Sequence, residues 1–235
     1  MNLRKLTMKT TRRAFLSAFV VIAVVSVSQL AAAQMVIDNF STGAYAKTLT
    51  KGIDNNTQTG SMAGASRYTV LSVCEPDNCA DYNPFRQPNS FQVRPATKST
   101  PSALIFNTGY KSDANLQVIY GGGSPMNLNL SPTYDRIRLY FDGADQGINF
   151  ALTVYTGGPY SSIGCNFVDP AGDLKPFTVD LPFANFGGSA DFSDITEMDF
   201  EFDLSQGLYT GEDWALTSIQ AVLGGQADIT CGSGS

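Results

Sequence analysis

Hydrophobic and polar side chains alternate along much of the chain with a period of two. In the clearest segment, 148–155, apolar residues stand at every second position: Ile148, Phe150, Leu152 and Val154. The same rhythm recurs in 137–141, 177–181 and 197–204. A period of two places successive side chains on opposite faces of a β-strand, one buried and one in water. The pattern therefore predicts strands, and no window favours an amphipathic helix.

Further strand candidates are shorter and are separated by glycine-rich turn signals such as 121–123 and 157–159. These candidates cover 35–40, 67–73, 90–94, 102–107, 115–120, 126–130 and 213–222. Many short strands at this spacing are typical of an all-β sandwich or barrel. We predict an antiparallel β-sandwich of the jelly-roll type, with a single domain over 34–235. The polar stretches 41–66 and 75–100, apart from the short strand at 90–94, are expected to form long loops at one end.

The first 33 residues have the organisation of a cleavable signal peptide. They contain five basic and no acidic residues, an apolar run from Phe15 to Val27, and three alanines immediately before Gln34. The apolar run is shorter than the ~20 residues that a membrane-spanning helix needs. We therefore expect residues 1–33 to be removed, and the mature chain to work in the periplasm or outside the cell with no membrane span.

The basic part of this leader contains a pair of arginines. Residues 11–16 read TRRAFL and resemble the bacterial twin-arginine export signal, with Ser17 where a lysine usually stands. Paired arginines also occur in ordinary signal peptides. Both the general secretory route and the twin-arginine route remain open, and the second implies export of a folded bacterial protein.

The charge of the chain argues against two classes of partner, nucleic acids and anionic lipid surfaces. All 21 acidic residues, but only 10 of the 15 basic ones, lie after residue 33, so the predicted mature chain has a net charge of −11. Nucleic-acid binding needs clustered Lys and Arg to neutralise phosphates, and docking on anionic lipid needs the same. The composition instead suits a soluble protein, or one that concentrates divalent cations.

The four cysteines are an even number in a chain predicted to be exported, which favours disulfides. They are Cys74, Cys79, Cys165 and Cys231, and three pairings are possible. Cys74–Cys79 would close the turn 75–78, whereas Cys165–Cys231 would tie the C-terminal tail to a central strand. Loop-closure entropy gives ~2 kcal/mol for the first and ~4 kcal/mol for the second. A cysteine metal site is disfavoured because there is no C-x-x-C spacing and no histidine.

Three short stretches carry a family resemblance. They are 36–43 (VIDNFSTG), 64–70 (GASRYTV) and 116–122 (LQVIYGG). In this order they resemble a group of poorly characterised exported bacterial β-sandwich proteins. In outline that group is similar to galactose-binding-like jelly rolls, which are often carbohydrate-binding modules. The resemblance implies a jelly-roll fold and carries over no catalytic residues. Many members of the group carry a C-terminal sorting segment, an apolar anchor with an arginine cluster, and since residues 213–235 do not match it we expect no sorting to a surface anchor.

The chain contains no histidine, which narrows the chemistry it can perform. Ser-His-Asp and Cys-His nucleophilic catalysis and histidine-ligated metals are excluded. No phosphate-binding or dinucleotide-binding fingerprint is present either. Catalysis by paired carboxylates, as in glycosidases, remains possible. It requires two carboxylates ~5–9 Å apart, and because any acidic strand provides that spacing, the spacing alone does not identify a hydrolase.

The most concentrated acidic segment is a predicted strand. Its carboxylates lie on one face, about 6.6–7 Å apart at alternate positions: Glu197, Asp199, Glu201 and Asp203. Such a row needs water, opposing basic residues or a cation. Ca²⁺, with six to eight oxygen ligands, is the only cofactor candidate. Alternatively, the row could be opposed by Arg136 and Arg138, which lie on the outward face of their own strand. A third interpretation is that the row is simply exposed to water, where its charge discourages aggregation of the sheet edge.

Several aromatic residues fall in predicted loops or at strand ends. Sugar rings stack on such side chains while amides and carboxylates bind their hydroxyl groups. The candidate ligand-binding residues are Tyr82, Phe85, Tyr110, Tyr160 and Asn83, whereas Trp214 is expected in the core. The leading hypothesis is an exported non-catalytic module that binds a glycan or another surface ligand. The alternatives are a structural or matrix protein without a small ligand, and a carboxylate-dependent glycan hydrolase or lyase.

Overall fold

The computed structural model describes residues 33–74, 83, 85–110, 112–145, 147–170, 174–203 and 213–232. Of the predicted features, the signal peptide (apart from Ala33), Tyr82 and Cys79 lie outside the described residues. The described residues contain no helix with the length and apolar character needed to span a bilayer.

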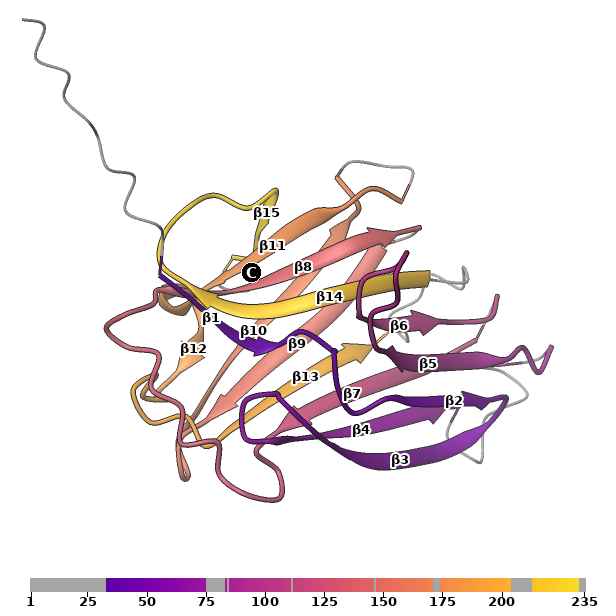
Figure 1. The fold of residues 1–235 in the computed structure, drawn as a ribbon, viewed down its shortest axis with the longest axis horizontal. Helices are drawn as coiled ribbons and strands as arrows, with labels where there is room; N and C mark the ends of the chain where they lie inside the picture. The colour runs from indigo at the N-terminus through magenta and orange to yellow at the C-terminus, as the bar shows by residue number, and fades with distance from the viewer. Residues whose placement is uncertain are drawn as a thin grey trace, which may run out of the picture. The chain divides into compact units, whose positions relative to one another are not determined.

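Within the described residues, fifteen strands form two sheets packed face to face (Figure 1). The eight-stranded sheet has the order β15 (Ile229–Thr230), β11 (Phe177–Pro182), β8 (Arg136–Ala144), β14 (Asp213–Val222), β6 (Ala103–Asn107), β5 (Asn89–Arg94) and β2 (Tyr45–Leu49). β1 (Gln34–Asp38) pairs with the second half of β14, beyond the part that pairs with β6. Every pairing in this sheet is antiparallel except that of β11 with β15.

The seven-stranded sheet is antiparallel throughout. Its order is β12 (Gly187–Gly188), β10 (Tyr160–Val168), β9 (Gly147–Tyr155), β13 (Glu197–Asp203), β7 (Ala114–Tyr120), β4 (Ser66–Val73) and β3 (Gly52–Thr59). The only other regular element among the described residues is a single 3-10 turn, η1 (Phe183–Asn185). The prediction of an all-β antiparallel sandwich is confirmed.

The core is built by the period-two pattern. In β9 the apolar residues at alternate positions are fully buried and those between them are partly exposed. Trp214 is 2% exposed and packs against the rings of Phe106, Phe141 and Phe202, which come from both sheets. Trp214 is therefore a core residue, as predicted, and it joins the two layers at one end of the sandwich.

Three segments differ from the prediction. Residues 41–66 are not a long loop, because they contain the edge strands β2 and β3. Residues 126–130 form no strand and make only an isolated bridge between Leu128 and Ile195. β10 was not predicted, because its polar and small residues interrupt the hydrophobic alternation. The strands that were missed lie at or next to sheet edges, where one neighbouring strand is absent and less apolar area is buried.

The three stretches that carry the family resemblance meet in the interior. Arg67 is fully buried and forms an ion pair with Asp38, whose carboxylate also accepts a hydrogen bond of 2.8 Å from the Tyr120 hydroxyl. Arg67 Nε donates to Gln58 Oε1 at 2.9 Å, and its guanidinium lies over the Phe40 ring. Burial and the neighbouring Asp38 carboxylate raise the pKa of Tyr120 well above its ordinary value. These stretches therefore specify a buried polar network that fixes β1, β4 and β7 relative to one another.

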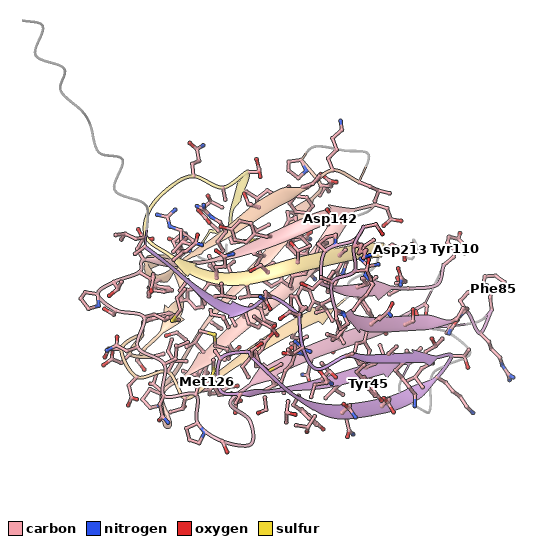
Figure 2. All side chains as sticks on the ribbon, in the orientation of Figure 1. Tyr45, Phe85, Tyr110, Met126, Asp142 and Asp213 are labelled. Carbon is pink, nitrogen blue, oxygen red and sulfur yellow. A yellow bond between two sulfur atoms is a disulfide. The ribbon has the colours of Figure 1, made fainter. Side chains whose placement is uncertain are left out.

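One open side of the sandwich is closed by polar side chains. Tyr45 and Lys47 of β2 reach across to Asp54 of β3, at 2.7 Å and 2.8 Å respectively (Figure 2). β2 and β3 are the edge strands of different sheets. Tyr45 therefore holds two edges together.

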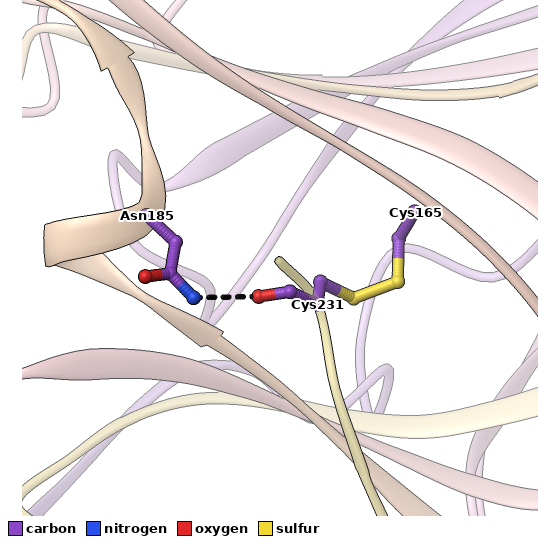
Figure 3. Close-up of a disulfide and its surroundings, with 3 residues drawn as sticks. All are labelled: Cys165, Asn185 and Cys231. Carbon is purple, nitrogen blue, oxygen red and sulfur yellow. Dashed lines mark hydrogen bonds between the residues drawn. A yellow bond between two sulfur atoms is a disulfide. The ribbon is translucent and has the colours of Figure 1, made fainter. Parts of the chain in front are cut away.

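The opposite side is closed by a disulfide. Cys165 of β10 bonds to Cys231, which follows β15, with their Cα atoms 5.5 Å apart (Figure 3). Asn185 Nδ2 donates to the Cys231 carbonyl at 2.7 Å and fixes the chain there. The predicted Cys165–Cys231 pair is present, although β10 lies next to the edge of its sheet and is not a central strand. The Cys74–Cys79 pair stays a prediction, because Cys79 lies outside the described residues.

Candidate functional site

The outward side of the seven-stranded sheet gathers aromatic and acidic residues from strands far apart in the sequence. We call it the seven-strand face, and it consists of the outward side chains of β3, β4, β7, β13, β9 and β10. Its central residues are Tyr68, Gln117, Ile119, Glu197, Asp199, Glu201, Thr153, Tyr155 and Tyr160. Strand register places them in rows, because directly opposed residues of antiparallel strands project from the same side of the sheet.

One row consists of two tyrosines and a carboxylate. Tyr155 of β9 stands opposite Tyr160 of β10 on one side and opposite Glu197 of β13 on the other. The rings of Tyr155 and Tyr160 have centroids 6.0 Å apart at 41°, and Tyr160 is 57% exposed. This row offers a ligand two aromatic rings beside a charged hydrogen-bond acceptor.

A hollow of about 420 Å³ continues from this row on the far side of β13. Its walls include Tyr68, Ile119 and Glu197, and Thr57, Ser66, Gly122 and Gly123 complete them. Glu197 thus lies between the tyrosine pair of β9 and β10 and the hollow lined by Tyr68. Apolar and polar groups alternate across the face, which is the composition of a ligand-binding surface.

The acidic residues of β13 repel one another. Burial, followed by the charges of Glu201 and Glu197, raises the pKa of Asp199 to about 6. The Oδ1 atom of Asp199 is buried and has no hydrogen-bond partner. Glu201 accepts a hydrogen bond of 2.8 Å from Asn115 Nδ2. Asp199 is therefore a carboxylate of this row whose ionised form is disfavoured by its surroundings.

The expectation that Arg136 and Arg138 oppose these acids is wrong. Both arginines belong to β8 in the other sheet, where they bind the buried carboxylate of Asp180 at 2.9 Å and 2.6 Å. Within the described part of the chain, no Lys or Arg forms an ion pair with Glu197, Asp199 or Glu201. Cross-strand pairs form between neighbouring strands of one sheet. Because β8 and β13 belong to different sheets, their outward side chains cannot pair in this way.

The Ca²⁺ ligand set remains a prediction. In the described residues, no three His, Cys, Asp or Glu side chains converge in a way that could hold a metal ion. Glu197, Asp199 and Glu201 follow one another along β13, and the side chain of Asp203 lies outside the described residues.

The predicted loop residues do not form one site with Tyr160. Phe85 and Tyr110 lie side by side at one end of the molecule, with ring centroids 6.5 Å apart at 18° (Figure 2). Tyr110 precedes the start of β7, whereas the row of Tyr160 and Glu197 lies beyond the other end of that strand, at Tyr120. The sequence candidates thus divide between opposite ends of the sheet.

Asn83 has a supporting position. It is 2% exposed, and its side chain binds the carbonyls of Thr50 and Gln87 and the amide of Gln87 at 2.8–3.0 Å. Any contribution of Asn83 to ligand binding therefore acts through the loop that carries Phe85.

Sequence reasoning missed two aromatic residues of the seven-strand face. Tyr68 and Tyr155 were assigned to strands, but neither was singled out as a ligand contact. A signal was available, because both tyrosines occupy the polar phase of an alternating strand. A large aromatic side chain at such a position is presented to solvent instead of the core.

A second, smaller hollow lies on the outer side of the eight-stranded sheet. It measures about 250 Å³, and its walls include Asp142, Asp213 and Trp214. Burial and the neighbouring Asp145 carboxylate raise the pKa of Asp213. Trp214 is directed into the core, so this hollow lacks an open aromatic ring and is a weaker candidate.

Comparisons with known proteins found similarity in structure only. Neither the protein-family models nor the curated proteins gave a match. A family 30 carbohydrate-binding module shares 11% identity at a TM-score of 0.43, over 83% of this chain and 90% of the module. A family 11 carbohydrate-binding module from Clostridium thermocellum, in complex with a β-1,3-1,4-mixed-linked tetrasaccharide, shares 12% identity at 0.37, over 81% and 95%. Because these TM-scores lie below 0.5, we base the functional proposal on this chain's own geometry.

Proposed function

We propose that this protein is an exported, non-catalytic glycan-binding module, and that the seven-strand face binds the glycan. The observation that carries the proposal is the row of Tyr160, Tyr155 and Glu197 on three adjacent strands. Tyr160 is 57% exposed on a regular strand of the sheet. A ring held in this way loses little conformational entropy when a ligand stacks on it.

The chemistry of the face fits a sugar. The CH groups of a pyranose ring stack on an aromatic ring, and its hydroxyl groups bind carboxylates and amides. Tyr155 and Tyr160 provide the rings, and Glu197 and Gln117 provide the polar groups on neighbouring strands. Because the ionised groups on the central strand are carboxylates, the face favours neutral glycans over uronate or sulfate polymers.

The location follows from the leader and the disulfide. The Cys165–Cys231 bond needs an oxidising compartment, which agrees with a leader at residues 1–33. We place the mature protein in the periplasm or outside the cell, where polysaccharides are accessible. The bacterial origin implied by the twin-arginine-like motif belongs to the same proposal.

Calorimetric titration tests the proposal with three soluble polymers: mixed-linkage β-glucan, β-1,4-galactan and xylan. We expect one of them to bind, and Tyr160→Ala and Tyr155→Ala each to weaken that binding by about two- to tenfold, since an aromatic contact contributes about 0.5–1.5 kcal/mol. Tyr140→Ala is the matched control, because Tyr140 lies on the outward phase of β8 in the other sheet. Equal losses for all three variants would contradict the proposed face.

A glycan hydrolase is the second candidate, and the raised pKa of Asp199 is the observation that favours it. A carboxyl group that titrates near 6 can donate a proton to a leaving group, with a second carboxylate nearby as base. Incubation with the same polymers tests this activity. Release of reducing sugar that is abolished by Asp199→Asn would establish a hydrolase. The absence of binding to any polymer, together with self-assembly, would instead favour a matrix protein.

A further inference from the structure

Phe85 and Tyr110 form an exposed aromatic pair outside the seven-strand face. Their side chains are 59% and 55% exposed, and their rings are nearly parallel. Single exposed apolar residues are common on protein surfaces. Two large rings that meet on the surface, from loops 25 positions apart in the sequence, call for a specific explanation.

The loop that carries Phe85 is held in place by hydrogen bonds of Asn83. The amide of Arg86 donates to the Asn83 carbonyl at 3.0 Å and closes a turn with Phe85 inside it. The buried side chain of Asn83 binds this turn to Thr50 and Gln87. The four contacts of one asparagine therefore hold the backbone on both sides of Phe85.

The loop that carries Tyr110 is fixed in the same way. The amide of Ser112 donates to the Gly109 carbonyl at 3.0 Å, which closes a turn around Tyr110. Asn89 is fully buried, and its side chain accepts from the Gly109 amide at 3.0 Å and donates to Ser112 Oγ at 2.7 Å. A second buried asparagine thus holds the second turn.

The two loops also interlock. A Cβ atom on Gly109 would lie 2.0 Å from Cβ of Gln87, so only glycine allows the backbones to approach this closely. Asn89 Nδ2 additionally donates to the Gln87 carbonyl at 3.1 Å. Two buried asparagines and one glycine therefore place Phe85 and Tyr110 next to each other before any ligand arrives.

We propose that the Phe85–Tyr110 pair is a second glycan-binding site, separate from the seven-strand face. The proposal rests on the proposed function for the class of ligand. Two nearly parallel rings with centroids 6.5 Å apart offer stacking surface for sugar rings, and the exposed Arg86, which follows Phe85 in the chain, carries donors for hydroxyl groups. The pair stands exposed at one end of the molecule as an aromatic platform, which suits stacking against the sugar rings of a polysaccharide chain (Figure 2).

The distance between the two sites determines which ligands can occupy both. The strands of the sheet run for about six residues, or roughly 20 Å, between the row of Tyr155 and the opposite end of the face. A short oligosaccharide at one site therefore leaves the other site open. A polymer can occupy both sites, or two polymer chains can be joined, so the protein binds polysaccharide with avidity and cross-links it.

The experiment compares a short ligand with a long one. The purified protein is titrated with mixed-linkage β-glucan and with the tetrasaccharide released from it. The NMR resonances of four aromatic rings are monitored, those of Phe85, Tyr110, Tyr155 and Tyr160. β-1,4-Galactan and xylan serve as further polymers. The double variant Phe85→Ala/Tyr110→Ala removes the platform, and Leu223→Ala, which truncates a 46% exposed side chain just after β14 of the other sheet, is the matched control.

We expect the resonances of Phe85 and Tyr110 to shift with a polymer. We expect the double variant to lose at least tenfold in polymer avidity and to lose polymer cross-linking, while it retains its melting temperature and its affinity for a short ligand at Tyr160. Shifts at Phe85 and Tyr110 without any at Tyr155 and Tyr160 would contradict the seven-strand face and support this site. Unchanged resonances with all three polymers, together with wild-type avidity of the double variant, would overturn the second site.

Discussion

The guanidinium of Arg67 and the carboxylate of Asp38 form an ion pair inside the sandwich, where both side chains are at most 2% exposed. The two residues come from β4 in the seven-stranded sheet and β1 in the eight-stranded sheet, so the pair links the layers. Removal of two charges from water costs several kcal/mol each, and the surrounding hydrogen bonds offset that cost only while both partners are present.

The first prediction follows from this pair. Arg67→Met leaves the Asp38 carboxylate buried without its partner, and it should lower the free energy of unfolding by about 3–5 kcal/mol. Urea denaturation measures the change. Lys47→Met is the matched control, because Lys47 is 37% exposed in its pair with Asp54, and an exposed ion pair stabilises a fold far less than a buried one. A similar loss in both variants would contradict the role assigned to the buried pair.

The second prediction concerns the bond between the sheets. Cys165 and Cys231 are 66 positions apart, and closing a loop of that length restricts the unfolded chain by ~4 kcal/mol. The double variant Cys165→Ser/Cys231→Ser should therefore be less stable in urea by roughly that amount. It should retain the sheet signal in circular dichroism, because the core rings do not depend on the bond. A variant as stable as the wild type in urea would show that the bond adds nothing.

The fold was predictable where burial is one-sided and regular. In β9 and β13, apolar residues at every second position specify both the strand and its buried face. The inward positions of β3 hold no apolar side chain, because this edge strand faces a polar part of the interior that contains Arg67; they are Gly52, Asp54, Asn56 and Gln58. Such a strand has no hydrophobic period to detect.

The candidate site was less predictable, because it is assembled by register. The sequence shows Tyr160 and Glu197 as separate features 37 positions apart. Only the pairing of β9 with both β10 and β13 places Tyr155 between them. The alternative in which Arg136 and Arg138 oppose the acidic row failed for the same reason, since strand order determines which residues face one another.

The third prediction concerns the leader. Replacement of Arg12 and Arg13 by lysine should abolish export if the chain uses the twin-arginine route, which reads that pair, and should leave export intact on the general secretory route. Fractionation of expressing bacteria and N-terminal sequencing measure the outcome, and the exported protein should begin at Gln34. Arg4→Lys is the control. Purified extracytoplasmic protein that still begins at Met1 would contradict the cleavage.

The fourth prediction is a dependence of stability on pH at Asp199. Its pKa of about 6 in the folded protein lies above the value of 3.8 for a free carboxyl group, so the folded state binds the proton more tightly than the unfolded state. Stability should consequently fall as pH rises from about 4 to about 6, and should stay lower above that range. Partial solvent screening limits the loss to about 1–2 kcal/mol.

Asp199→Asn tests this assignment, because asparagine keeps the shape of the side chain and carries no charge. The variant should match the wild type in urea denaturation near pH 4 and exceed it by about 1–2 kcal/mol at pH 7. Glu201→Gln should reproduce part of this gain, since the charge of Glu201 is the largest electrostatic cause of the raised pKa after burial. If the stability of Asp199→Asn depended on pH as the wild type does, the pKa of Asp199 would be the same in the folded and unfolded states. The crowding of carboxylates on β13 would then be relieved by solvent, and the loss of stability would have to arise from another group.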